Sequence, residues 1–570
     1  MNNVFKYRVV TSFITLMFTC AFLSGCAQND DGGTNTSTAK IVKKPHVLFI
    51  SIDDLRPMLA SYGDPLAKTP NLDLLASQGV QFNNAYAQQA ICGPSRASVL
   101  TGMRPDTLEV THNYVKFRHK LKDVVTIPQY FIENGYNAAG FGKVFHHGDK
   151  DEALAWNWQP AIDKLPEGIK KPSRYALKVN NDLQDNYRKK MRAKYGEQAK
   201  FGLGSGPAFE SADVPDSTYK DGYTTELAKV TVDEMLALSN KPLFIGFGMN
   251  KPHLPWIAPK KYWDMYDPKE IALTNKNIMP TSAPEKSASM GIHASFELRT
   301  FYNVPNYGEI SPELAVELRH AYLACVSYVD AQIGKMLAHL KEKNILDETI
   351  IVVWSDHGYH LGDMGIWGKA SNYEIATRVP LIISTPEMRN GSEQAVQGQK
   401  SNALVELIDI YPTLAELAGL PITKNLEGLS LVPLLSEPSK VWKTAAFSQF
   451  PTPALREWGA YPLRQGMRET YFGKLIVDVE KRIKAQQKNK WDRELFEKYL
   501  MGYSMRTERY RFIAWLDKRD LNKAPLYIEL YDHKTDKHET VNVAGKNDKT
   551  VKELLKQLLD HLDKKARVGV

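Results

Sequence analysis

Cysteine is scarce in this chain, with four residues among 570: Cys20, Cys26, Cys92 and Cys325. Because two of them lie near the N-terminus, only two remain for the body, and the composition indicates no disulfide framework. Cys325 falls in a helical pattern and is expected to pack in a core. Neither sign of charge dominates, because 73 Lys and Arg are nearly balanced by 65 Asp and Glu, and the net charge is only +8. That balance gives no indication of nucleic-acid binding.

An apolar run at the N-terminus, residues 9–23, is too short for a comfortable membrane span. It ends in Leu-Ser-Gly-Cys26, which resembles a bacterial lipobox. We therefore predict a lipoprotein signal peptide over 1–25, lipidation of Cys26, and a flexible tether over 26–44. Because Ala27 carries no acidic retention signal, the expected location is the outer membrane of a bacterial cell envelope, on its periplasmic or surface side. The lipid would be the only membrane contact, and an ordinary secretory signal peptide is the alternative.

The length of 570 residues exceeds one ordinary core, so two domains are expected. Apolar runs of strand length alternate with helical patterns through most of the chain, which is typical of α/β proteins. The expected strands are 45–52, 137–142, 243–248, 349–355 and 379–384. The expected helices are 71–78, 125–134, 311–344 and 403–418.

The pattern changes near residue 447. Residues 452–500 are rich in aromatic residues and lysine, without clear alternation, and are interpreted as an insertion of unassigned role. Beyond it, two expected strands and a closing helix predict a smaller α+β subdomain with a short antiparallel sheet, at 509–515, 526–532 and 551–564. The predicted organisation is a larger domain over 45–446 and a C-terminal subdomain over 447–570.

Acidic residues follow two of the expected buried strands directly. Asp53 and Asp54 come after the first strand, and Asp356 and His357 come after the strand at 349–355. Ligand sites in open α/β sheets cluster at the carboxyl ends of the strands. Adjacent carboxylates repel each other unless a cation binds them, and oxygen-rich ligand sets favour Ca²⁺ or Mg²⁺. The alternative is an Asp-Asp turn in which one residue only caps.

The segment Ala90–Gly102 places a cysteine, Cys92, in a turn-prone Cys-Gly-Pro-Ser sequence, with Arg96 four residues later and an apolar helical run closed by Thr-Gly. A cysteine before a helix start faces unpaired backbone N–H groups and the positive end of the helix dipole, which suits an anion or a nucleophile. The alternative interpretation of this spacing is a buried structural cysteine beside a surface arginine.

The run Cys-x-Pro-Ser-Arg, followed after two residues by two apolar residues and Thr-Gly, resembles the signature of the type I sulfatase family at every position. That resemblance implies an alkaline-phosphatase-like sandwich with a central, mostly parallel sheet flanked by helices. It also implies that a formylglycine-generating maturation enzyme converts Cys92 to formylglycine. One Ca²⁺ per chain is implied, with a ligand set of Asp53, Asp54, Cys92, Asp356 and His357.

The same resemblance implies roles for further residues. Lys143 and Lys369 would hold the sulfate oxygens, and Arg96 would fix the formylglycine hydrate. His253 would protonate the leaving oxygen, and His146 would take a proton when sulfate is expelled. The neighbouring His147 is interpreted as structural, because the family spacing selects His146.

Within that family, the chain is most similar to iduronate-2-sulfatase-like sulfatases over roughly 45–565. The similarity rests on short segments spread along the chain: Arg104–Thr107, Thr126–Phe131, Gly142–His146, Lys251–His253, Ser355–Gly358, Ser448–Pro451 and Glu529–Asp532. The implied activity is hydrolysis of sulfate monoesters in a sulfated polysaccharide or its oligosaccharides, such as ulvan or glycosaminoglycans. The alternatives are a phosphonate or phosphate ester hydrolase of the same superfamily, and a non-catalytic surface lipoprotein that binds glycans.

Overall fold

The computed structural model describes residues 44–146, 152–201, 203–274, 281–282, 295–392, 396–451 and 466–568. The predicted lipidation site Cys26, the signal peptide and His147 lie outside the described residues. Residues 44–570 form one compact unit. Among the helices in the described ranges, none is long and apolar enough to cross a membrane.

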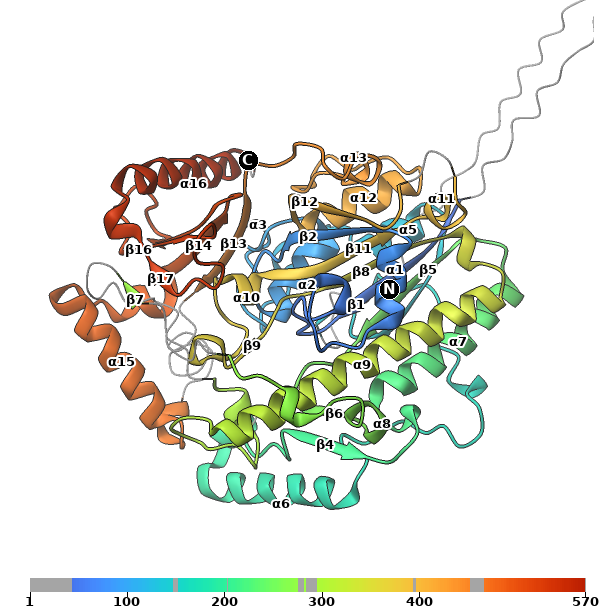
Figure 1. Ribbon diagram of the computed structural model, residues 1–570, viewed down its shortest axis with the longest axis horizontal. Coiled ribbons are helices and arrows are strands. Elements are labelled where there is room, and N and C mark those ends of the chain that lie inside the picture. Colours follow the sequence, from blue (N-terminus) through green and yellow to red (C-terminus); the bar gives the residue numbers. More distant parts are fainter. Residues whose placement is uncertain are drawn as a thin grey trace, which may run out of the picture. The chain divides into compact units, whose positions relative to one another are not determined.

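A seven-stranded sheet forms the centre of this unit, with the strand order β12-β2-β11-β8-β1-β5-β3. Its strands are β1 (His46–Ile52), β2 (Val80–Tyr86), β3 (Asn137–Gly142), β5 (Leu243–Met249), β8 (Thr349–Ser355), β11 (Arg378–Ser384) and β12 (Gln399–Glu406). Only β11 runs antiparallel to its neighbours β2 and β8. The prediction of a mostly parallel central sheet is therefore confirmed (Figure 1).

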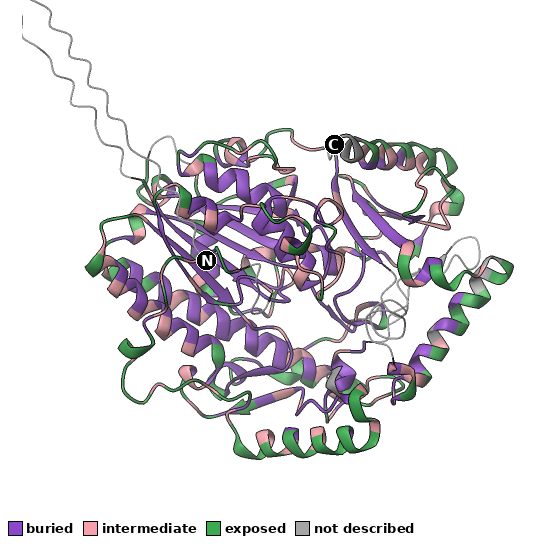
Figure 2. Ribbon diagram, turned by 180° about the vertical axis from the view of Figure 1, so that it is seen from behind, coloured by how far each residue is buried: buried purple, intermediate pink, exposed green. Residues whose placement is uncertain are grey.

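Helices cover both faces of the sheet because its inner strands are apolar on both sides. In β1, Leu48 and Ile50 belong to one buried cluster, and Val47 and Phe49 belong to the other. The first cluster includes side chains of α1 (Pro70–Ser77), α7 (Lys220–Leu238) and α9 (Pro312–Glu342). The second includes side chains of α2 (Cys92–Thr101), α5 (Ile127–Glu133) and α12 (Ile410–Leu417). The central strand β1 is buried at every position, whereas the outer helix α6 (Lys178–Tyr195) is mostly exposed (Figure 2).

One predicted helix is wrong in its first part. Residues 403–418 were expected to be helical, but Ala403–Glu406 belong to β12, and α12 begins only at Ile410. The apolar residues of this stretch pair with β2 in parallel register, Leu404 with Asn84 and Val405 with Ala85. A capping box between Glu406 and Asp409 then starts the helical turn. Pairing at the sheet edge therefore overrides the local helical pattern.

The C-terminal part holds the predicted short antiparallel sheet, in the order β13-β14-β15-β16. Its strands are β13 (Ala446–Pro451), β14 (Leu500–Arg506), β15 (Tyr510–Asp517) and β16 (Tyr527–Asp532). The closing helix α16 (Asp548–Val568) contributes Leu554, Leu558 and Leu562 to a cluster on this sheet. Of the predicted insertion 452–500, residues 452–465 lie outside the described part, and the remainder contains α15 (Gly473–Gln487), which buries Ile476 and Ile483.

Candidate active site

The candidate site lies at the carboxyl edge of the central sheet. Strands β1 and β8 are parallel neighbours, with Ile52 paired to Ser355, so the residues that follow them leave the sheet side by side. Asp53, Asp54, Asp356 and His357 are all at most 1% exposed. The backbone N–H of Asp54 donates to Oδ1 of Asp356 over 3.1 Å. Asp54 itself has a left-handed φ of 64°, a conformation that aspartate tolerates better than most residues.

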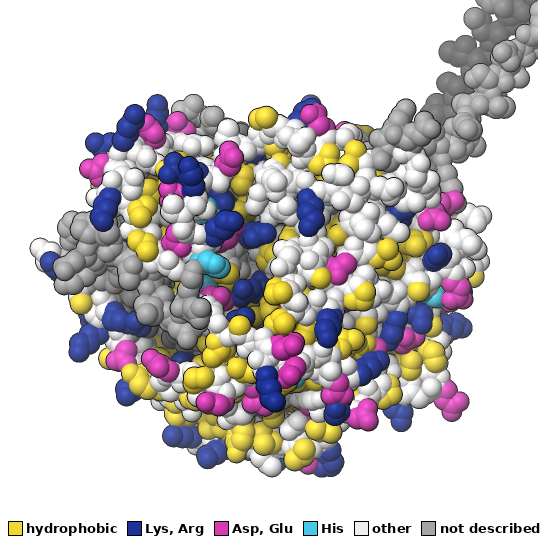
Figure 3. All heavy atoms as spheres, in the orientation of Figure 1, with side chains coloured by type: hydrophobic (Ala, Val, Ile, Leu, Met, Phe, Trp, Pro, Cys, Tyr) yellow, Lys and Arg dark blue, Asp and Glu magenta, His cyan; other side chains and the backbone are white. Residues whose placement is uncertain are grey.

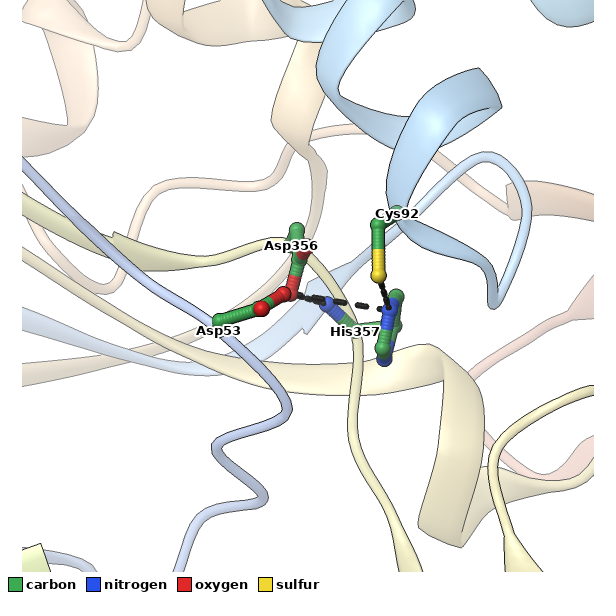
Figure 4. A group of neighbouring side chains, drawn as sticks. All are labelled: Asp53, Cys92, Asp356 and His357. Carbon is green, nitrogen blue, oxygen red and sulfur yellow. Dashed lines mark hydrogen bonds and ion pairs between the residues drawn. The ribbon is translucent and has the colours of Figure 1, made fainter. Parts of the chain in front are cut away.

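Cys92 is the first residue of α2, so the helix begins at the cysteine rather than after it. Its Sγ atom lies 3.3 Å from Nε2 of His357 and 3.6 Å from Nζ of Lys369. In Figure 4, Cys92 points from the start of α2 toward the side chains that follow β1 and β8. The residue is only 2% exposed. The sulfur therefore lies beside charged groups at a helix N-terminus, as the sequence predicted.

Arg96 lies one turn further along α2 and joins the strand ends. Its Nε donates to Oδ2 of Asp356 over 2.8 Å, and its Nη2 lies 3.4 Å from Oδ1 of Asp53. Nη1 donates to the backbone oxygens of Lys143 and Val144. With 0% of its surface exposed, Arg96 is a fixed buried cation and not the surface arginine of the alternative interpretation.

Two lysines complete the positive groups. Lys143, which follows β3, forms an ion pair with Asp53. Lys369 donates to both carboxylate oxygens of Asp54, over 2.8 and 3.0 Å. They are 4% and 7% exposed, respectively. Two buried lysines that reach the same cluster from distant parts of the chain can bind an anion placed against Cys92.

His253 lies in the loop after β5. Its Nε2 is 3.2 Å from Oε1 of Glu297, whose other carboxylate oxygen is 3.5 Å from Nζ of Lys369. Glu297 is not among the residues predicted from the sequence. No motif surrounds it, and only the fold brings it to His253.

The structure places His146 beside α2, where it lines a small cavity of about 20 Å³ together with Gly93 and Arg96. Burial, and then the charge of Lys143, lower its pKa to about 3, so the ring is neutral at pH 7. All the residues predicted for the site therefore gather at the same end of the sheet.

The carboxylates of the pair after β1 differ electrostatically. Burial raises the pKa of Asp53, but Lys143, His253 and Arg96 outweigh it and hold the pKa well below 3.8. Burial raises the pKa of Asp54 well above 3.8, although Lys369 opposes this shift. Burial lowers the pKa of His357, but Asp356 and Cys92 outweigh it and raise the pKa to about 9.

The donor atoms are close enough to share one cation. Suitable atoms of Asp53, Cys92, Asp356 and His357 lie within 4.8 Å of one another, as do those of a second set that combines Asp53, Asp54, Cys92 and His253. Carboxylate oxygens are the ligands that hard divalent ions prefer. The charge of Lys369 alone does not keep the buried Asp54 carboxyl ionised, so its pKa is raised. A divalent cation bound beside Asp54 would supply the additional positive charge.

Solved structures share this architecture. A phosphonate monoester hydrolase from Agrobacterium radiobacter matches with a TM-score of 0.63 and 22% identity, over 91% of this chain and 96% of that one. A protein solved in complex with D-glucosamine-2-N,6-O-disulfate matches with a TM-score of 0.61 and 21% identity, over 92% and 98%. These matches show that the chain has an alkaline-phosphatase-like fold.

Sequence comparison identifies the family. The family model described as Sulfatase matches residues 45–420. Iduronate 2-sulfatase of Mus musculus is 32% identical over 555 residues, covering 90% of each chain, and that of Homo sapiens is 31% identical over 532 residues, covering 85% and 87%. A sulfatase of Formosa agariphila is 31% identical over 434 residues, covering 72% and 76%. The chain belongs to the sulfatase family and is a sulfuric ester hydrolase.

Proposed function

We propose that this enzyme removes sulfate from a sulfated glycan or its oligosaccharides, in the manner of an iduronate-2-sulfatase-like enzyme. The observation that carries the proposal is Cys92 at the start of α2, between His357 and Lys369. The similarity to mammalian iduronate 2-sulfatases over 90% of the chain supports the glycan substrate.

The proposed nucleophile is formylglycine derived from Cys92, with a formylglycine-generating enzyme as the maturation partner. The Sγ atom then marks where an oxygen of the modified side chain would lie. When hydrated, formylglycine supplies one hydroxyl whose oxygen attacks sulfur and displaces the alcohol, and a second hydroxyl whose deprotonation re-forms the aldehyde and expels sulfate together with the first oxygen. A plain thiol or hydroxyl lacks that second group, so the conversion explains why a buried cysteine lies among so many charges.

Ca²⁺ is the proposed metal, held by Asp53, Asp54, Asp356 and His357 together with the side chain at position 92. Bound there, a divalent cation would lower the pKa of a neighbouring hydroxyl and offset sulfate charge. Arg96 holds the carboxylates of Asp53 and Asp356 in place through its two contacts. Its burial means that this orientation is built before substrate arrives.

Lys143 and Lys369 are the proposed ligands of the sulfate oxygens. Each lysine is paired with a different carboxylate of the cluster, Lys143 with Asp53 and Lys369 with Asp54. As compact ammonium groups they can move between a carboxylate and a sulfate oxygen with little rearrangement. They would thereby offset charge that develops on the sulfonyl oxygens.

His253 is the proposed proton donor to the leaving oxygen, and Glu297 is its positioning residue. Burial and Lys369 hold the pKa of His253 well below 6.5, while Glu297 raises it. The imidazolium form therefore needs more negative charge nearby, and the sulfate of a bound substrate supplies it. His146, which is neutral at pH 7, is the proposed proton acceptor when sulfate leaves.

A phosphonate or phosphate ester hydrolase is the second candidate, because phosphonate monoester hydrolases share the fold at TM-scores of 0.62 and 0.63.

The proposed cellular location is the outer membrane, where the protein would be a lipoprotein anchored through Cys26. A Cys26→Ala variant is expected to leave the membrane fraction, and an unchanged distribution would reject the anchor.

The test of the function is a substrate panel. The protein is co-expressed with a formylglycine-generating enzyme, and free sulfate is measured by ion chromatography after incubation with heparin, chondroitin sulfate and ulvan oligosaccharides. Phosphonate monoesters and phosphate diesters are assayed in parallel, with Cys92→Ala as the control. Sulfate release by the wild type alone is expected. Turnover restricted to the phosphorus esters would favour the second candidate.

A further inference from the structure

A cavity of about 780 Å³ lies between the central sheet and the C-terminal sheet, and we call it the basic cleft. One wall is formed by Tyr62 and residues of β2, β11 and β12, including Asn83 and Lys400. The opposite wall is formed by Arg506 and the turns that follow β14 and β16, including Lys534. None of the lining residues belongs to the candidate active site. The volume is in the range of ligand-binding sites in proteins, about 300–1,000 Å³.

The lining is strongly basic. Six Lys or Arg side chains line the cleft, against two glutamates, Glu374 and Glu508. Glu374 is already paired through its Oε2 with Arg511, which lies outside the lining, over 2.6 Å. Much of its negative charge is therefore offset inside the wall, which leaves the cationic groups dominant toward the cavity.

A buried network fixes the floor of the cleft. Arg506 is 7% exposed; its Nη2 donates to Nδ1 of His533 over 3.0 Å, and its Nε lies 3.4 Å from Oε2 of Glu374. The Nε atom of Arg506 has no hydrogen-bond acceptor among the described residues. His533 Nε2 lies 2.9 Å from Oε1 of Glu539. The guanidinium of Arg506 is thus held rigidly in the floor of the cleft, with its Nε turned toward Glu374.

The same network argues against a metal in the cleft. Donor atoms of Glu374, His533 and Glu539 lie close enough together to bind one ion. However, Arg511 already contacts both carboxylates, over 2.6 and 3.1 Å. Since His533 Nδ1 accepts from Arg506, its Nε2 carries the hydrogen that points to Glu539. A cation would have to displace Arg511 and the His533 hydrogen from the carboxylates, whereas an anion in the cleft could bind the lining Lys and Arg side chains without breaking these contacts.

Amide groups on the opposite wall suit a polyhydroxylated ligand. Asn83 Nδ2 donates to Oδ1 of Asn402 over 2.8 Å, and Asn84 Nδ2 donates to the backbone oxygen of Asn402 over 2.8 Å. Tyr62 is anchored at this wall by hydrogen bonds of its hydroxyl to the backbone oxygens of Phe82 and Leu381, 3.1 Å each. Fixed amides can bind sugar hydroxyls while the cations opposite bind sulfate groups.

We propose that the basic cleft is a second binding site, separate from the active site, for a sulfated glycan chain. The choice of glycan as the ligand rests on the proposed function, whereas the preference for an anion rests on the cleft alone. The site would hold a neighbouring stretch of a long substrate and so raise its local concentration at the active site.

The test compares charge-reversal variants. Lys400, Lys534 and Lys537 are exposed side chains of the lining, and the variant K400E/K534E/K537E reverses them. The matched control K549E/K552E/K556E reverses three lysines of α16, none of which lines the cleft. Affinity for a heparin-derived octasaccharide is measured by calorimetry at low and physiological salt. The comparison ligand is an unsulfated heparosan octasaccharide, which keeps the uronate carboxylates but lacks sulfate. Melting temperatures confirm folding.

The cleft variant is expected to bind the heparin octasaccharide about tenfold more weakly than the control variant does, with a shallower salt dependence. Turnover of a small aryl sulfate should be equal in both variants. Equal octasaccharide affinity in the two variants would overturn the proposal. If no sulfated glycan is hydrolysed but the cleft variant still loses affinity, only the proposed function fails, and the second site stands.

Discussion

The ion pair between Glu374 and Arg511 should be one of the largest single contributions to the stability of this enzyme. Glu374 begins the short helix α10 (Glu374–Thr377), and Arg511 lies on β15, so the pair joins the C-terminal sheet to the segment that follows Lys369. Oε2 of Glu374 lies 2.6 Å from Nη2 of Arg511, whose side chain is 0% exposed. The perturbation is Glu374→Gln, which keeps the volume and a hydrogen bond to the Tyr86 hydroxyl.

The size of the effect follows from the pKa of Glu374. Burial raises this pKa, but Arg511 and Arg506 outweigh it and lower the pKa from 4.5 to about 2. At about 1.4 kcal/mol per unit, that shift corresponds to about 3 kcal/mol of stability at pH 7. Removing one partner of a buried ion pair costs about 3–5 kcal/mol in other proteins, which agrees. Glu374→Gln should therefore lower the free energy of unfolding by about 3 kcal/mol.

The pH dependence identifies the cause. Because the folded-state pKa lies below the unfolded one, the stabilisation is present above about pH 4.5 and is lost as the pH falls toward 2. The difference between wild type and Glu374→Gln should be constant above about pH 5 and shrink by about 1 kcal/mol by pH 3.5. Urea unfolding followed by tryptophan fluorescence measures both quantities, with exposed Glu553→Gln as a control expected to stay within about 0.5 kcal/mol of wild type. A difference below about 1 kcal/mol at pH 7, or one that does not change with pH, would refute the reasoning.

Three further predictions concern the reaction. His253→Ala should slow hydrolysis of an alkyl sulfate by about 10²–10⁴-fold but that of 4-nitrophenyl sulfate by less than about tenfold, because a good leaving group needs no proton; equal losses on both esters would remove His253 as the proton donor. Glu297→Gln should lower kcat on the alkyl sulfate by about tenfold with little change in KM, whereas exposed Glu309→Gln should match wild type; a larger effect on KM than on kcat would contradict a positioning role. Chelation with EGTA should abolish sulfate release and lower the melting temperature, and Ca²⁺ should restore both; full activity after verified metal removal would refute the metal site.

The fold and most of the site could be predicted because their signals are local. A parallel strand buried on both faces is a continuous apolar run, and the polar residues at its end are adjacent in sequence, as with Asp53 and Asp54 after β1. Since β1 and β8 are neighbours in the sheet, their end residues must meet. The cysteine motif also predicts the start of a helix at Cys92, and the N-terminus of α2 lies at this same edge of the sheet.

What could not be predicted depends on contacts between distant segments. Ala403–Glu406 have a helical pattern, but pairing with β2 makes them a strand. Glu297 belongs to no motif and reaches His253 only through the fold. The basic cleft combines residues from both sheets whose side chains, taken singly, read as an ordinary charged surface. On the face shown in Figure 3, Lys, Arg and His side chains gather around a hollow beside the C-terminal elements, a grouping that no stretch of sequence displays.

The central claim is that position 92 carries the nucleophile of a glycan sulfatase. The most direct test is the sulfate released from a heparin-derived disaccharide that carries a single 2-O-sulfate on its uronate. The wild type is co-expressed with a formylglycine-generating enzyme, mass spectrometry verifies the aldehyde at position 92, and Cys92→Ala is assayed beside it. Stoichiometric release by the wild type and none by Cys92→Ala is the predicted result. Equal release by both proteins would contradict the account. So would a wild type that carries the aldehyde but releases no sulfate from this disaccharide or from any glycan of the substrate panel.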